Sequence, residues 1–270
     1  MIILAVVLGL GAGVLANCLA DDLPAEEAGQ PRPLRRPHCH QCGMALPVSR
    51  WSALGAWLTG RGRCSNCAAA RGARAVWVEA GAALGGAALW LWAGGDLGRW
   101  AAAGVVAFIF LVITIIDIEH RLILWRVVWV SGVVLLALGG LSPDRGWSKT
   151  LIGGVVGYGL VALLFLLGQA YAWGVARLRG QPLDEIAFGG GDVNLAGLIG
   201  LAVGWSGVLV ALFLGVLAAG VFSLGYIVFL VARRRYNPHI PIPYGPFLIA
   251  GALAIYLYGR ELAGWWLAGR

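Results

Sequence analysis

Long apolar stretches alternate with short polar ones along most of this chain. Eight of the apolar stretches approach or reach the ~20 residues that an α-helix needs to cross a bilayer. Leu, Ala, Val and Gly dominate them and turn residues separate them, so the pattern favours membrane helices over the strands of a barrel. The predicted spans are 2–19, 76–93, 100–117, 123–141, 150–173, 193–206, 207–231 and 243–259.

Two of these predictions have an alternative. Only Trp205-Ser206-Gly207 separates the sixth run from the seventh, so the pair predicts either two helices or one long kinked hairpin. The first run has the apolar character of a signal peptide, but it lacks a basic segment before it and a small-x-small cleavage site after it. We therefore predict that residues 2–19 form a retained membrane helix.

The composition agrees with a membrane protein. Of the 270 residues, 60% are hydrophobic and 12% are charged, whereas soluble globular domains carry about 25% charged residues. The 42 glycines suit close helix packing in lipid, where small residues let two backbones approach. The expected fold is an all-α, polytopic membrane helix bundle of about eight spans.

The basic residues lie in the loops and predict the orientation of the chain. The net charge of +7 would suggest nucleic acid in a soluble protein, but loop Arg and Lys residues orient membrane helices. With the amino terminus outside, the inner loops hold 15 basic residues and the outer loops hold 5. This asymmetry places residues 21–75, the end of the third run and the start of the sixth on the cytoplasmic side. The expected partner is the lipid bilayer, and no nucleic acid is expected.

The long polar stretch at residues 21–75 carries two cysteine pairs. Its Cys39-x-x-Cys42 and Cys64-x-x-Cys67 motifs are 21 residues apart, which is close to the spacing of a four-cysteine zinc site. Four thiolates complete the tetrahedron of a structural Zn²⁺ ion. Because this loop has little apolar core, a metal would supply much of its folding free energy.

Two alternatives apply to this cysteine loop. The four thiols can instead form two disulfides, but thiols stay reduced on the predicted cytoplasmic side. His38 and His40 flank Cys39 and are further candidate ligands.

Two acidic residues stand at the ends of apolar runs, where a carboxylate is costly and needs a reason. Asp117 ends the third run, and Asp192 follows three glycines directly before the sixth run. Two carboxylates that meet resist ionising together, so one of them holds a proton that the pair shares. The sequence therefore predicts an aspartic dyad at one edge of the membrane.

Each acid also has a purely structural interpretation. Asp192 suits the N-cap of a helix, where its side chain would accept backbone N–H groups, and Asp117 suits a helix end paired with Arg121. A capped carboxylate is biased towards ionisation. Asp192 would then be the charged member of the pair and Asp117 the proton carrier, in a pair that titrates jointly.

Taken together, these motifs resemble the type IV prepilin leader peptidase and N-methyltransferase family, part of the GxGD class of intramembrane aspartyl proteases. The resemblance extends over nearly the whole chain, and the order and spacing of the motifs make it specific. The matching segments are the run from Gly11 to Asn17 with Leu23-Pro24, Cys39-x-x-Cys42-Gly43, Gly60-Arg61-Gly62-Arg63-Cys64-x-x-Cys67, Glu79, Asp117, Gly189-Gly190-Gly191-Asp192 and Pro243-Tyr244-Gly245-Pro246-Phe247.

The resemblance implies an activity. Asp117 and Asp192 would be the catalytic residues, and they would cleave the leader peptide of a prepilin or pseudopilin at the cytoplasmic face of a bacterial inner membrane. A second family activity methylates the new amino terminus with S-adenosylmethionine and is associated with the cysteine loop. The residues that would support the catalytic site are Gly189, Gly190, Gly191, Pro243, Gly245 and Pro246.

The same resemblance divides the chain into three parts. Residues 1–20 would form the first membrane helix, residues 21–75 the four-cysteine zinc loop, and residues 76–270 the membrane-embedded aspartyl peptidase bundle. The acids and the zinc ligands would then belong to different parts of the chain.

The chain departs from the family pattern in three places, one of which is the loop around Val48-Ser49-Arg50-Trp51, where Pro and Ser positions typical of the family are lacking. Ile123-Leu124-Trp125 stands where the family usually has Ile-Pro-Asp or Ile-Pro-Asn, and Asn194 stands where it usually has Lys. These departures bear on substrate preference and efficiency, and they leave a catalytically degenerate zinc-loop scaffold as an alternative. An ion-coupled transporter is another, because intramembrane acids often mark ion paths, although such acids are expected near the midplane.

Overall fold

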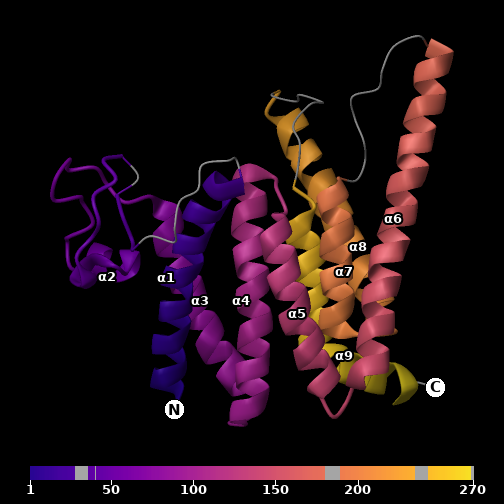
Figure 1. Cartoon of the computed structure of the whole chain (residues 1–270), viewed down its shortest axis with the longest axis horizontal. Coiled ribbons are helices and arrows are strands. Elements are labelled where there is room, and N and C mark those ends of the chain that lie inside the picture. The colour runs from indigo at the N-terminus through magenta and orange to yellow at the C-terminus, as the bar shows by residue number, and fades with distance from the viewer. Residues whose placement is uncertain (28–35, 40, 180–188, 235–242, 269–270) are drawn as a thin grey trace. The chain divides into compact units, whose positions relative to one another are not determined.

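The computed structural model describes residues 1–27, 36–39, 41–179, 189–234 and 243–268 (Figure 1). Over these residues the chain is helical, with two isolated β-bridges and no strand. The elements are α1 (Ile2–Glu27), the 3₁₀ helix η1 (Val48–Arg50), α2 (Ala53–Leu58), α3 (Ala73–Trp92), α4 (Leu97–His120), α5 (Trp125–Leu141), α6 (Gly146–Arg179), α7 (Gly190–Val203), α8 (Gly207–Ala232) and α9 (Gly245–Ala268).

Each predicted span falls on a helix, which confirms the all-α bundle. Five helices, α1, α3, α4, α6 and α8, are long and apolar enough to cross a membrane. The apolar parts of α5, α7 and α9 are shorter. Large apolar side chains are exposed along these helices, for example Leu166 at 61% and Phe213 at 65%. A helix that is apolar on every face requires an apolar surrounding, which the bilayer supplies.

The weak boundary between the sixth and seventh runs is a turn between two separate helices. α7 ends at Val203, and Gly204 follows with φ +77° and ψ 178°, a backbone conformation that favours glycine. The N–H of Trp205 then donates to the carbonyl oxygen of Lys149 at 2.8 Å, which ties the turn to the start of α6.

The chain forms two compact units, residues 1–116 and residues 117–270. The border lies within α4, so the last turn of that helix belongs to the second unit. The division into three parts with borders at residues 20 and 75, which the family resemblance implied, stays a prediction.

In the first unit, α1 packs along α3. Gly9 and Gly86 let the two backbones touch, since a Cβ at either position would overlap the opposite helix. Asn17 of α1 donates from Nδ2 to the carbonyl oxygen of Ala75 at 3.1 Å. This helix pair carries the cysteine loop, which follows α1 and precedes α3 in the chain.

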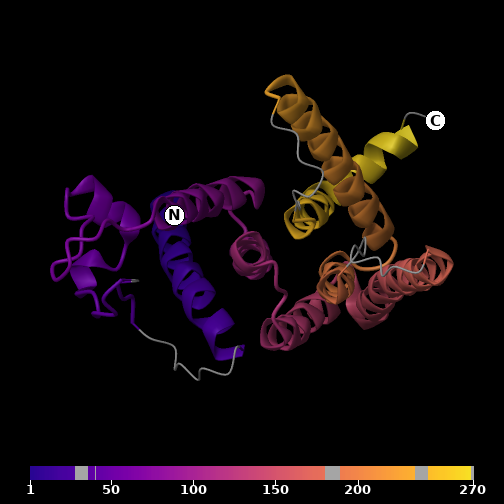
Figure 2. The ribbon, with the colours of Figure 1, turned by 90° about the horizontal axis from the view of Figure 1, so that it is seen from above.

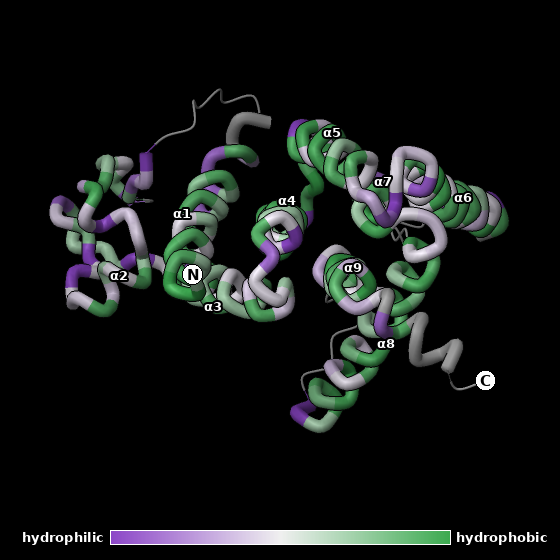
Figure 3. The backbone as a smooth tube through the Cα atoms, turned by 90° about the horizontal axis from the view of Figure 1, so that it is seen from below, coloured by the Kyte–Doolittle hydropathy of each residue, from purple (hydrophilic) through white to green (hydrophobic). Residues whose placement is uncertain are grey.

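In the second unit, α7 lies beside α5 and α6 and also contacts α8 and α9 (Figure 2). Gly153 of α6 meets Gly200 of α7 backbone to backbone, and Gly157 meets Ala196 in the same way. Such small residues let membrane helices approach closely. Hydrophobic residues dominate α5 to α9, whereas hydrophilic residues gather in the segment around α2 (Figure 3).

Candidate functional site

Asp117 lies in the last turn of α4, where the helix ends in a left-handed residue. Arg121 has φ +54°, and its N–H donates to the carbonyl oxygen of Asp117 at 2.9 Å. The Asp117 side chain is buried, with 8% of its residue surface exposed, and Oδ2 has no hydrogen-bond partner among the described residues. No ion pair with Arg121 is found among those residues, so the pairing expected from the sequence does not account for this acid.

Asp192 occupies the third position of α7 rather than the N-cap that the sequence suggested. The cap residue is Gly189. Its N–H donates to Oδ2 of Asp192 at 3.0 Å, and the N–H of Asp192 donates back to the Gly189 carbonyl oxygen at 3.1 Å. The Asp192 side chain therefore accepts the N–H of the cap residue from the third helical position, as acids at this position do in a capping box.

The two acids come close together in the second unit, although helices α5 and α6 lie between them in the chain. They are near enough for the charge of Asp192 to act on the carboxyl group of Asp117. Neighbouring carboxylates resist ionising together, so a pair of this kind shares a proton. The arrangement provides one buried carboxyl oxygen that is not committed to any hydrogen bond and one carboxylate held by a backbone N–H.

Two of the expected supporting residues, Gly245 and Gly189, contact the acids directly. Gly245 places its backbone against Asp117, and a Cβ there would overlap Oδ2. Pro246 follows in the first turn of α9, where a missing N–H costs nothing. Gly191 lies against Ile123, whose Cβ would be 3.2 Å from a Cβ at position 191. Pro243, which precedes this turn, is partly buried.

Gly189 acts through its backbone in the cap described above, whereas a Cβ at Gly190 would meet nothing within 4 Å. Of the three consecutive glycines, close packing requires only Gly191.

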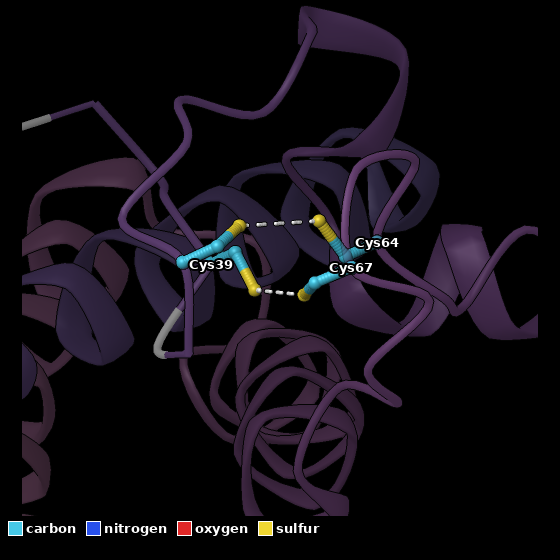
Figure 4. A group of neighbouring side chains, drawn as sticks. Cys39, Cys64 and Cys67 are labelled. Carbon is cyan, nitrogen blue, oxygen red and sulfur yellow. Dashed lines mark hydrogen bonds between the residues drawn. The ribbon is translucent and has the colours of Figure 1, made fainter.

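The four loop cysteines gather in the first unit (Figure 4). Their sulfurs lie within 4.8 Å of one another. The Cys39–Cys67 and Cys42–Cys64 sulfur distances are 3.6 and 3.7 Å. Disulfide sulfurs are ~2.05 Å apart, so the disulfide alternative is not what the structure contains. A tetrahedral site with Zn–S bonds of ~2.3 Å has S···S edges of about 3.8 Å, so the four thiols fit a metal ion.

Two equivalent backbone turns hold these cysteines. The N–H of Cys39 donates to Met44 and the N–H of Gly43 donates to Cys39, at 2.9 and 2.8 Å. The second turn repeats this pattern at Cys64, Ala68 and Ala69, with distances of 2.8 and 3.1 Å. Gly43 has φ +69° and Ala68 has φ +56°. The second turn therefore holds an alanine in the left-handed conformation that glycine adopts in the first.

Backbone N–H groups prepare two of the thiols to bind as thiolates. The N–H groups of Cys67 and Asn66 donate to Sγ of Cys64 and lower the pKa of that thiol to about 6. The N–H of Met44 lowers the pKa of Cys42 in the same way. His38 stands outside the cluster, with Nδ1 3.3 Å from the carbonyl oxygen of Arg36. His40 lies outside the described residues.

Glu79 has a structural role that sequence reasoning did not assign. It is fully buried in α3 and accepts hydrogen bonds from Ser52 Oγ at 2.7 Å, from the N–H of Ala53 at 2.9 Å and from the N–H of Leu54 at 3.0 Å. It therefore caps α2 and anchors the cysteine loop to the membrane helix. A carboxylate inside an apolar helix was the available signal, since such a group needs a partner.

Comparison with known proteins agrees with these motifs. The type IV leader peptidase family model matches residues 104–224, which contain both acids. The model of the bacterial peptidase A24 N-terminal domain matches residues 7–93, which contain the cysteine loop. No solved structure gives a significant match.

Several curated relatives carry the name prepilin leader peptidase/N-methyltransferase. The one from Aeromonas salmonicida is 28% identical over 85% of this chain and 74% of its own length. The one from Aeromonas hydrophila is 27% identical over 92% and 80%. The one from Burkholderia pseudomallei is 28% identical over 94% and 84%. With its apolar helices, the chain is a multi-pass protein of the inner membrane, and it belongs to the type IV leader peptidase family.

Proposed function

We propose that this protein cleaves the leader peptide of type IV prepilins or pseudopilins at the cytoplasmic face of the inner membrane. Asp117 and Asp192 are the proposed catalytic dyad. The observation that carries the proposal is their convergence in the second unit, where the charge of one acts on the other. The names of the curated relatives support the substrate.

The two carboxyl groups differ in a way that suggests their roles. Asp192 accepts a hydrogen bond from Gly189, which favours its ionised form and suits the base that draws a proton from the attacking water. The backbone N–H of Gly245 also acts on the carboxyl group of Asp117, but its Oδ2 is buried and has no hydrogen-bond partner among the described residues. Asp117 is therefore the proposed acid that donates a proton to the scissile carbonyl oxygen. That donation stabilises the tetrahedral intermediate, and the dyad then returns the proton to the leaving amine.

The orientation of the chain supports the cytoplasmic side. Fifteen of the 20 basic residues lie in the cysteine loop, or in or beside the loops that follow α4, α6 and α8. The end of α4 and the start of α7, which carry the two acids, adjoin these loops.

Cys39, Cys42, Cys64 and Cys67 are the proposed ligands of a structural Zn²⁺ ion. The sulfur spacing and the N–H groups that lower the pKa values of Cys42 and Cys64 support this ligand set. The ion would hold the two turns of the loop together, and the cleavage step itself draws on the dyad alone.

The second proposed activity is methylation of the new amino terminus with S-adenosylmethionine. It rests on the N-methyltransferase part of the relatives' names and has no residue assigned to it. A noncatalytic scaffold and an ion-coupled transporter are not favoured, because the acids form a pair at helix ends and the family is a peptidase family.

Coexpression of the protein with a prepilin tests the dyad. Asp117→Asn and Asp192→Asn should each abolish leader removal while protein level in the membrane stays unchanged. Full processing by either single variant would refute the dyad.

A further inference from the structure

The second unit has a large apolar cavity that is open along one side as a groove. The proposed chemistry does not use it. It has a volume of about 480 Å³ and lies among α5, α6 and α7. Trp125 and Trp129 line it from α5, Tyr158 and Gly159 from α6, and Asn194 and Gly197 from α7. None of its described lining residues is charged. Any occupant must therefore be apolar along most of its length.

The cavity begins at the catalytic end of the helices. Trp125 is the first residue of α5, and Asn194 follows Asp192 by two residues on α7. The starts of these two helices meet there, because Gly191 lies against Ile123. An occupant of the cavity would thus have one end beside the acid of α7.

The length of the cavity corresponds to a short stretch of helix. Its lining residues run from Trp125 to Gly132 on α5 and from Asn194 to Leu201 on α7. Seven residues of helix extend ~10 Å, which is about two turns. Gly159 of α6 leaves room for another helix to approach, as small residues do in membranes, whereas Gly132, Gly154 and Gly197 face side chains of the neighbouring helices. A Cβ on Gly159 would meet no atom within 4 Å.

We propose that this cavity seats the first turns of the apolar membrane helix that follows the scissile bond of the substrate. The inference rests on the proposed function and identifies where its substrate docks. The substrate helix would start at the dyad and run along the groove in the same direction as α5 and α7. Asn194, a polar lining residue that follows Asp192 by two residues, would contact the backbone at the start of that helix, where free N–H groups need acceptors.

A matched pair of α6 variants tests the groove. Gly159→Leu adds a large side chain to the lining of the cavity, at a position where a Cβ meets nothing within 4 Å. Gly168→Leu adds the same side chain to the same helix outside the cavity, at a position where a Cβ also meets nothing within 4 Å. Each variant is assayed in detergent with a full-length prepilin and with a short soluble peptide that spans the scissile bond and ends within the first residues after it. We expect Gly159→Leu to reduce kcat/KM for the prepilin relative to the peptide by about tenfold or more. Gly168→Leu should leave that ratio unchanged.

The outcomes separate the groove from the dyad. A ratio unchanged by Gly159→Leu, or lowered equally by Gly168→Leu, would overturn the groove while leaving the peptidase assignment intact. Processing that persists in Asp117→Asn would instead overturn the proposed function.

Photocrosslinking gives a second and independent measurement. A benzoylphenylalanine at position 129, in the Asp192→Asn background so that the substrate is held uncleaved, should crosslink to the helical part of the prepilin. Crosslinks to phospholipid alone, or to a second copy of this chain, would refute the assignment of the groove to the substrate.

Discussion

Gly245, the first residue of α9, lays its backbone against the carboxyl group of Asp117, and a Cβ at position 245 would overlap Oδ2 of the acid. This contact joins two segments that lie far apart in the chain. It also explains why a glycine precedes the proline at the start of α9. The backbone of Gly245 contacts the carboxyl group directly, so the position of Asp117 depends on residue 245 having no side chain.

Replacement of Gly245 by Ala is expected to displace the Asp117 carboxyl group. Because a displacement of about 1 Å at a reacting group can cost about 100-fold in rate, leader cleavage should fall by about that factor. The assay is the rate of prepilin processing by purified protein. Gly225→Ala is the matched control, since a Cβ at Gly225 in α8 meets nothing within 4 Å. Full activity in Gly245→Ala would show that this contact does not position the acid.

Metal analysis of the purified protein should find one zinc ion per chain. Cys39→Ser should lose it, because one of four tetrahedral ligands is removed. Cys18→Ser should retain it, since Cys18 lies in α1 outside the four-sulfur cluster. Native protein that purifies without metal, or a Cys18→Ser variant that loses it, would contradict the ligand set.

The left-handed Ala68 should weaken the second cysteine turn. Such a conformation costs a residue with a Cβ about 1 kcal/mol or more relative to glycine. Ala68→Gly is therefore expected to raise the zinc affinity about fivefold, measured by competition with a chelator. Gly43→Ala, the mirror change in the first turn, should lower the affinity by a similar factor. Equal affinities in all three proteins would mean that neither turn is strained.

Glu79→Gln should loosen the cysteine loop. The carboxylate accepts three hydrogen bonds at α2, and an amide offers one oxygen and turns its NH₂ group towards a donor. The expected destabilisation of the anchored loop is about 1–3 kcal/mol. Limited proteolysis should show faster cleavage in the loop. Glu119→Gln, a change at an exposed acid, should leave the digestion pattern as in the unchanged protein.

The helices themselves followed from local pattern. An apolar run of sufficient length has few alternatives to an α-helix in lipid, because every backbone polar group must find its partner within the segment. The two cysteine motifs were visible for the same reason, since short cysteine spacings record local geometry. The break at Trp205-Ser206-Gly207 was less clear, because the sequence left open whether one kinked hairpin or two helices form there. The zinc-ligand prediction relied on two cysteine pairs, and only two residues separate the cysteines within each pair.

Contacts between distant segments were not visible in this way. Asp192 was expected at the N-cap of its helix, but Gly189 takes that position and the acid bonds back to it. The partners of Glu79 lie on a helix in the loop, so its sequence neighbours gave no indication of them. The cavity beside α7 depends on which faces of three helices meet.

By itself, the sequence determined the membrane helices, the cysteine pairs and the identity of the two acids, because hydrophobic length and short-range spacing act within a single segment. Only the tertiary structure decided that Asp117 meets Asp192 and Gly245, since helix packing brings together groups that local forces cannot relate.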